Sequence, residues 1–230
     1  MEEGISAEIS EAVETIKTAG KLYLANWYPF LIIGLGFGIL NELTNTIMGV
    51  FKTNSVGIAS VINIFLSSFL TMAALNLSLQ IVRQEKVHLG RAFKDIRGKY
   101  FLYITVSLLS AVAAITGFLL LILPGIYFVT VFYFADLYVM MGKHTTMDAL
   151  KSSMHFVKGV FRPVFLCLVL IVCLILIPMA ISQNIQPQHY LASKMLILIV
   201  SIFLVPFTSL SKVVLHERVK KIKDKLMIEE

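Results

Sequence analysis

The stretch 100–141, YFLYITVSLLSAVAAITGFLLLILPGIYFVTVFYFADLYVMM, decides the fold class of this chain. The only charged residue of this stretch is Asp136. Lys99 directly precedes the stretch, and Lys143 lies two residues after its end. A helix needs about 20 mostly apolar residues to cross a hydrocarbon layer of ~30 Å, so the stretch is long enough for two spans. Because Pro124 and Gly125 interrupt it, we predict two spanning helices joined by a hairpin at this dipeptide.

Further apolar segments of span length lie on both sides of this hairpin. Together they predict six spans, at 27–48, 56–82, 100–123, 126–141, 163–182 and 195–215. The composition agrees, because 57% hydrophobic and 15% charged residues leave too little polar surface for a water-soluble chain of 230 residues. We therefore predict an all-α, polytopic membrane helix bundle. Residues 1–230 form a single integral membrane domain, with an amphipathic segment at 1–26, the bundle at 27–215 and a basic tail at 216–230.

The positions of the basic residues predict the orientation. Of the 20 lysines and arginines, only Lys52 and Lys194 lie in alternate connections, whereas the others fall in the segments 17–21, 83–99, 143–162 and 212–225. Cytoplasmic connections carry the excess of Lys and Arg in membrane proteins. We therefore expect both termini and these basic connections to lie in the cytoplasm.

The predicted cytoplasmic segments have an apolar periodicity of their own. Their apolar positions are Ile9, Val13 and Ile16, then Leu89, Phe93, Ile96 and Tyr100, then Leu150, Met154, Val157 and Phe161. Such spacing is typical of one face of an amphipathic helix at the membrane interface. The pairs Arg97-Gly98 and Lys158-Gly159 suggest a threefold internal repeat, although any amphipathic helix would show a similar stripe.

Asp136 and Glu42 are the carboxylates inside the predicted spans, and ionisable groups at that depth are often functional. We expect them at different depths, which argues against an acid–base dyad. With Asn63, Asn76 and Gln80 they form a candidate intramembrane polar site. The alternatives are a local hydrogen bond or an interfacial position for the carboxylates, and interhelical hydrogen bonds for the amides.

The basic connections predict contact with lipid headgroups. The candidate residues are Arg91, Lys94, Arg97, Lys99, Lys151, Lys158 and Arg162. The net charge of +6 does not indicate nucleic-acid binding, because every basic cluster adjoins an apolar span and anionic lipid is the nearer partner. A protein partner at the cytoplasmic face is a further expectation. The acidic segment 2–14 would either dock on the basic connections or remain a solvated face.

No motif indicates catalysis. The five histidines occur singly, without a Cys or carboxylate at metal-ligand spacing. There is also no phosphate-binding glycine loop and no nucleophile elbow. We therefore expect no catalytic residues, no cofactor and no metal, and predict that the chain is not an enzyme.

One region resembles a known family. The sequence Leu-Pro-Gly-Ile-Tyr at 123–127, an aromatic span, Ala-Leu-Lys-Ser-Ser at 149–153, Lys158-Gly159 and Phe-Arg-Pro at 161–163 resemble the YciC-like inner-membrane proteins. These are related to the membrane domain fused to some glycerophosphodiester phosphodiesterases. Many relatives have Trp where this chain has Met154. The resemblance implies a six-span protein of a bacterial inner membrane, without catalytic residues to carry over.

Three functional hypotheses follow. The first is a non-enzymatic protein of membrane organisation or lipid homeostasis that acts through contacts with lipids or a partner. The second is a small transporter or permease with a polar path near Asp136. The third is a membrane-bound enzyme that lacks a recognisable motif.

Overall fold

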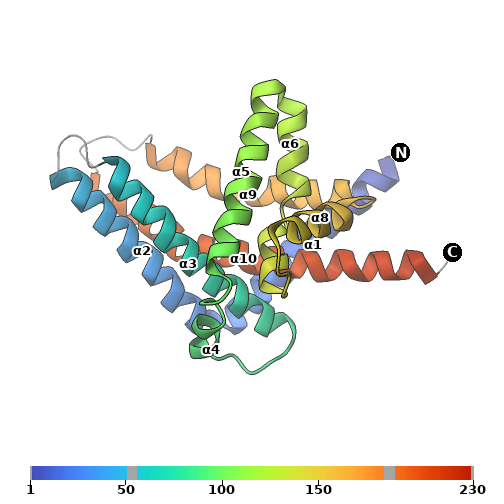
Figure 1. Ribbon diagram of the computed structural model, residues 1–230, viewed down its shortest axis with the longest axis horizontal. Coiled ribbons are helices and arrows are strands. Elements are labelled where there is room, and N and C mark those ends of the chain that lie inside the picture. The colour runs from blue at the N-terminus through green and yellow to red at the C-terminus, as the bar shows by residue number, and fades with distance from the viewer. Residues whose placement is uncertain (1, 51–55, 184–189, 229–230) are drawn as a thin grey trace. The chain divides into compact units, whose positions relative to one another are not determined.

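The structure is a computed structural model that describes residues 2–50, 56–183 and 190–228 (Figure 1). Within these residues the chain forms helices and turns, and no strand occurs. The helices are α1 (Glu2–Ala25), α2 (Trp27–Val50), α3 (Val56–Val82), α4 (Leu89–Lys94), α5 (Tyr100–Leu120), α6 (Ile122–Val131), α7 (Ala135–Met140), α8 (Thr146–Val157), α9 (Phe161–Gln183) and α10 (Tyr190–Ile228).

Six segments of the described residues are long and apolar enough to cross a membrane, as predicted. They are Trp27–Thr44, Val61–Val82, Tyr100–Leu120, Ile122–Met140, Phe161–Ile181 and Leu198–Asp224. Many of their apolar side chains are exposed, and Phe101 and Leu119 on α5 are about four-fifths accessible. A surface of this kind suits lipid and not water. The chain is therefore an all-α, multi-pass membrane protein.

The hairpin differs from its prediction in position. The chain turns at Leu121, whose extended backbone separates α5 from α6, and not at Pro124-Gly125. Pro124 lies in the first turn of α6, where its missing N–H costs no intrahelical hydrogen bond. Gly125 allows the two helices to approach, because a methyl group there would overlap the ring of Phe118. Gly117 has the same role, since its Cβ would lie 2.8 Å from the Cα of Gly125.

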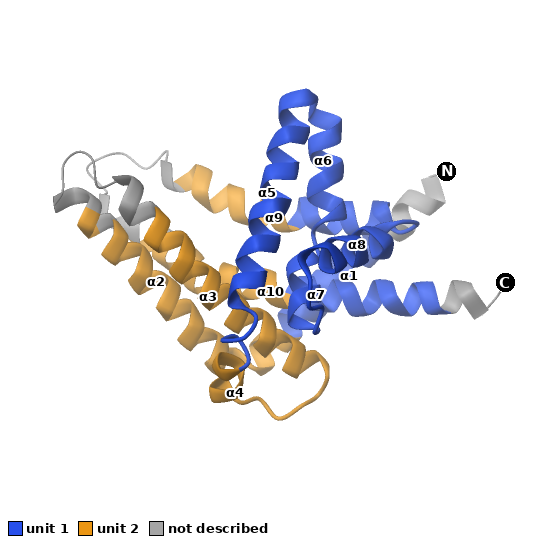
Figure 2. Cartoon of the chain, viewed as in Figure 1, with its two compact units in different colours: residues 1–21, 95–170, 211–230 blue, residues 22–94, 171–210 orange. Residues whose placement is uncertain are grey.

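The chain forms two compact units (Figure 2). The first contains residues 1–21, 95–170 and 211–230, and the second contains residues 22–94 and 171–210. Helices α1, α9 and α10 contribute to both.

In the second unit, small residues bring α2 against α10. A methyl group on Gly34 would overlap the carbonyl oxygen of Ile202, and one on Gly38 would lie 2.8 Å from the side chain of Leu198. Tyr23 of α1 stacks on Phe30 of α2 with ring centroids 5.0 Å apart. Close backbone approach through small residues is a common way for spanning helices to associate.

In the first unit, the amphipathic helix α8 packs beside α7 and α5. Its buried residues are Ala149, Leu150, Ser153, Phe156 and Val157. Met154, which the sequence placed on this face, is 42% exposed. The Thr145 hydroxyl caps the helix by accepting from the backbone N–H of Asp148 at 3.1 Å.

The acidic helix α1 contacts the basic tail. Arg218 of α10 donates to the hydroxyl of Thr18 at 2.7 Å and lies 3.3 Å from the carboxylate of Glu14. Within residues 9–25 of α1 the buried side chains are Ala12, Thr15, Ala19 and Tyr23, whereas Ile9 is exposed. Ala12 and Thr15 lie one position before Val13 and Ile16 of the predicted stripe, which are themselves half-buried.

The structure does not show the threefold repeat. The three segments differ in length, since α1 has 24 residues, α4 has 6 and α8 has 12. Gly159 has a left-handed backbone with φ of 89°, and its supposed counterpart Gly98 does not. The matching basic–glycine pairs thus have different local structures.

Candidate functional site: a broken span and a basic cavity

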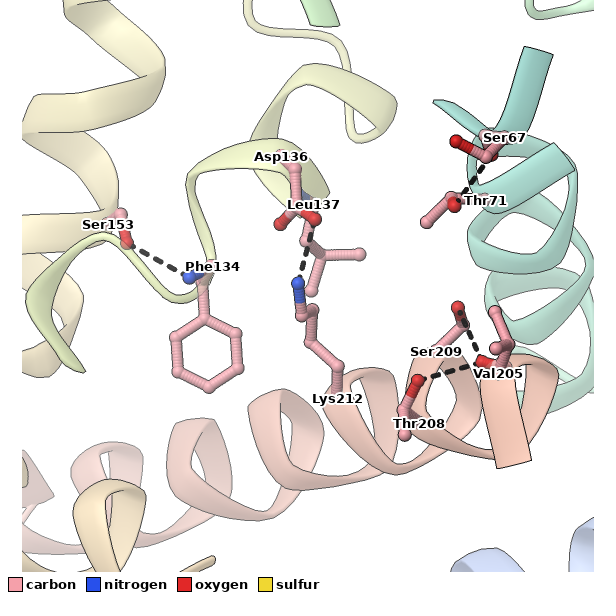
Figure 3. A network of polar contacts seen from close by, with 10 residues as sticks. All are labelled: Ser67, Thr71, Phe134, Asp136, Leu137, Ser153, Val205, Thr208, Ser209 and Lys212. Atoms are coloured by element: carbon pink, nitrogen blue, oxygen red, sulfur yellow. Dashed lines mark hydrogen bonds and ion pairs between the residues drawn. The ribbon is translucent and has the colours of Figure 1, made fainter. Parts of the chain in front are cut away.

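The fourth span is not one continuous helix. It breaks at 132–134 between α6 and α7, which leaves backbone groups without their helical partners. Ser153 of α8 satisfies two of these groups. Its hydroxyl donates to the carbonyl oxygen of Val131 at 2.6 Å. It also accepts from the N–H of Phe134 at 3.2 Å (Figure 3). Irregular backbone is tolerated inside membrane proteins where protein groups satisfy it in this way.

Asp136 lies in the first turn of α7, directly after this break. Its Oδ2 is 2.7 Å from Nζ of Lys212 on α10, and its Oδ1 accepts from the N–H of Leu137 at 2.8 Å (Figure 3). The Lys212 ammonium also lies 4.7 Å from the centroid of the Tyr133 ring. The two charged side chains are only 16–17% exposed, so they form a largely buried ion pair. The positive charge of Lys212 therefore compensates the cost of burying the Asp136 carboxylate.

An aromatic cluster adjoins this ion pair along α10. The buried His216, one turn after Lys212, stacks on Phe156 with centroids 4.4 Å apart. Its Nε2 is 3.3 Å from the hydroxyl of Tyr138. Sequence reasoning missed Lys212, Ser153 and His216 as parts of this site. The signal for Lys212 was present, because it is a charge followed by the apolar residues 213–215 and intramembrane charges usually pair.

The other predicted polar residues lie in the second unit, and each has a defined neighbour. The side-chain amide of Asn63 donates to the Thr44 hydroxyl at 2.7 Å and thereby links α3 to α2. Glu42 is partly exposed and borders an apolar cavity of about 370 Å³ with residues of α2 and α10. Asp136 belongs to the first unit, whereas Glu42, Asn63, Asn76 and Gln80 belong to the second.

Asn76 and Gln80 fasten the connection after α3. The amide of Asn76 donates to the carbonyl oxygen of Ala92 at 3.3 Å, and Oε1 of Gln80 accepts from the N–H of His88 at 2.9 Å. Both side chains are buried. They therefore hold the segment 88–92 against α3, which is a structural role.

That fastened segment forms one wall of a cavity of about 780 Å³ in the second unit. The opposite wall is the junction of α1 and α2, with the exposed side chains of Trp27 and Tyr28. Arg91 and Lys94 of α4 also border the cavity, and both side chains are exposed. None of the described residues that line it is acidic. The cavity therefore combines aromatic rings with two basic side chains.

The remaining predicted headgroup contacts are mostly exposed. Arg97, Lys151, Lys158 and Arg162 are exposed in the first unit. Lys99 is half-buried, and its ammonium donates to the carbonyl oxygen of Met140 at 2.8 Å, close to the end of α7. The structure thus gives Lys99 a structural contact and leaves the others accessible.

No group of three or more His, Cys, Asp or Glu residues in the described part of the chain is arranged to hold a metal ion. Neither a family model nor a curated protein nor a solved structure matches the sequence.

Proposed function

We propose that this chain is a non-enzymatic protein of a bacterial cytoplasmic membrane that binds anionic phospholipid headgroups and acts in membrane organisation or lipid homeostasis. The observation that carries the proposal is the cavity bordered by Trp27, Tyr28, Arg91 and Lys94. The resemblance to the YciC-like proteins supports the location, and the excess of basic residues supports a cytoplasmic position for this surface.

The lining of the cavity suits a phospholipid better than a soluble ligand. Trp and Tyr favour the headgroup level of a bilayer, and Trp27 begins the first span. Arg91 and Lys94 lie three residues apart on α4, so their charges reach the same region. A basic residue near an anionic membrane surface contributes about 1 kcal/mol of attraction. The aromatic rings would thus set the depth of the headgroup while the two cations bind its phosphate.

The test compares two double variants that remove the same charges. Arg91→Gln with Lys94→Gln changes the cavity, whereas Arg83→Gln with Lys86→Gln changes exposed residues of the same connection that do not line it. We expect the cavity variant to lower the affinity of the purified full chain for phosphatidylglycerol on the order of thirtyfold, from ~1 kcal/mol for each charge. Native mass spectrometry of protein–lipid complexes measures this, with phosphatidylcholine as the neutral reference. Equal losses in both variants would mean that only overall charge matters and would refute a specific site.

The transporter hypothesis has one observation in its favour. The fourth span is broken beside Asp136, and interrupted spans form substrate sites in some transporters. Against it, the carboxylate is already paired with Lys212. Under this hypothesis Asp136 would have to exchange its lysine partner for a proton or cation during transport. A double-mutant cycle of Asp136 and Lys212 tests this.

A further inference from the structure

A second basic cavity lies in the first unit and has no lining residue in common with the proposed headgroup site. Its volume is about 350 Å³, within the range of small-ligand sites. Three parts of the chain form it. Lys143 comes from the turn after α7, Ser152 and His155 from α8, and Lys220 and Lys223 from the charged end of α10.

The lining is strongly biased toward positive charge. Three lysines border the cavity, against the single carboxylate of Asp224. Lys220 and Lys223 are three residues apart on one helix, so their ammonium groups are neighbours and repel each other when no anion is present. An anion in the cavity would remove this repulsion and gain charge-assisted hydrogen bonds.

Lys223 is the most fixed of the three lysines. Its Nζ donates to the carbonyl oxygen of His155 at 3.2 Å and lies 5.4 Å from the centroid of the Phe156 ring. An ammonium group has three N–H donors, and the carbonyl oxygen occupies only one of them. The group is therefore held at the cavity wall with donor capacity left for a ligand, at a smaller entropic cost than a freely moving lysine would have.

The chemistry of the lining indicates which anion fits. Ammonium groups, the hydroxyl of Ser152 and the imidazole of His155 are all donors to phosphate oxygens. Lys220 and Lys223 lie five and eight residues after Leu215, the end of the apolar run, which is about 8 and 12 Å along a helix. Lys220 and Asp224 at the cavity are exposed, which makes the cavity reachable from outside the protein.

We propose that this cavity binds a phosphate-bearing anion through Lys143, Lys220 and Lys223. The anion is either a small soluble phosphate compound or a lipid headgroup, since both present the same phosphate oxygens. The proposal is independent of the headgroup site at Arg91 and Lys94, because the two cavities share no lining residue.

The experiment uses inorganic pyrophosphate as the probe for the soluble source. It is titrated into the full chain in a neutral detergent at constant ionic strength, and binding is followed by calorimetry. Lys223→Gln should weaken binding on the order of tenfold, the effect of losing one charge-assisted contact of about 1.4 kcal/mol. The matched control is Lys221→Gln, which removes the same charge from an exposed neighbour that does not line the cavity, and it should bind like the parent.

A second arm tests the lipid source with nanodiscs that contain phosphatidylglycerol or only phosphatidylcholine. Both variants are made in a chain that also carries Arg91→Gln and Lys94→Gln, so that the other proposed lipid site is weakened. Reduced phosphatidylglycerol binding in Lys223→Gln but not in Lys221→Gln, without pyrophosphate binding in detergent, would assign the phosphate to a lipid. If Lys223→Gln fails to fold, Lys220→Gln takes its place, because that side chain is exposed. The proposal is overturned if neither arm shows binding that distinguishes the cavity variants from Lys221→Gln.

Discussion

At the residue scale, Asp136 and Lys212 stabilise each other within the apolar surroundings of the first unit. Breaking a largely buried ion pair by removing one partner leaves the other charge uncompensated. We therefore expect Asp136→Asn and Lys212→Gln each to lower the free energy of unfolding, on the order of 2 kcal/mol after allowing for their partial exposure. The double variant should lose clearly less than the sum of the two. Unfolding of the full chain in mixed micelles measures this double-mutant cycle.

The same cycle separates the structural and transport roles of Asp136. If the pair is structural, the double variant should retain any solute flux that the parent shows in proteoliposomes. Additive losses of stability, together with an Asp136→Asn variant that folds but loses proton-coupled flux, would instead assign the carboxylate to transport.

At the element scale, the break between α6 and α7 depends on Ser153. Its hydroxyl bonds to the groups of Val131 and Phe134 that the interrupted helix leaves open. Ser153→Ala should therefore destabilise the protein by about 1–3 kcal/mol, the cost of leaving buried polar groups unsatisfied. Ser152→Ala is the matched control, since that residue is half-buried on the same helix and should have a small effect. Equal thermal stability of the two variants would show that the break does not need this side chain.

The spans of this chain could be predicted from its sequence, whereas the position of the hairpin and the break in the fourth span could not. The six spans were predictable because apolar length alone determines them. The hairpin prediction missed the turn at Leu121, because Pro124 is tolerated in the first turn of a helix as well as in a loop. The break at 132–134 has no proline or glycine to announce it, and its stabilising hydroxyl comes from a helix about 20 residues further along the chain.

The candidate site was predictable only in part, because the partners of its residues are distant in the sequence. Asp136 was evident as a charge in an apolar run, but its partner Lys212 lies 76 residues away. Asn76 and Gln80 were visible as polar residues of a span, whereas their contacts to the connection 88–92 depend on how that connection folds back. The sequence shows which polar or charged residues lie within a span, and only the tertiary contacts show which residues pair with them.

At the scale of the whole molecule, the six spans and the distribution of basic residues predict a single orientation. An even number of crossings places both termini on one side, and the basic connections favour the cytoplasm for that side. Lys52 lies outside the described residues, and Lys194 is used here for the opposite face that the charge distribution predicts. Single cysteines at Lys94, Lys151, Lys194 and Lys221, in a chain with Cys167 and Cys173 replaced by alanine, test this orientation.

An impermeant thiol reagent applied to spheroplasts should label only Lys194→Cys, and the other three cysteines should react after the membrane is permeabilised. Lys94, Lys151 and Lys221 are exposed on the protein, so poor labelling before permeabilisation would reflect the membrane and not burial. The comparison of Lys94 with Lys151 is decisive for the fold. If these two positions label from opposite sides, the stretch 100–140 crosses the membrane once, and the α5–α6 hairpin at Leu121 does not span the bilayer as two helices. Labelling from the same side requires an even number of crossings between them, as the two spans Tyr100–Leu120 and Ile122–Met140 predict.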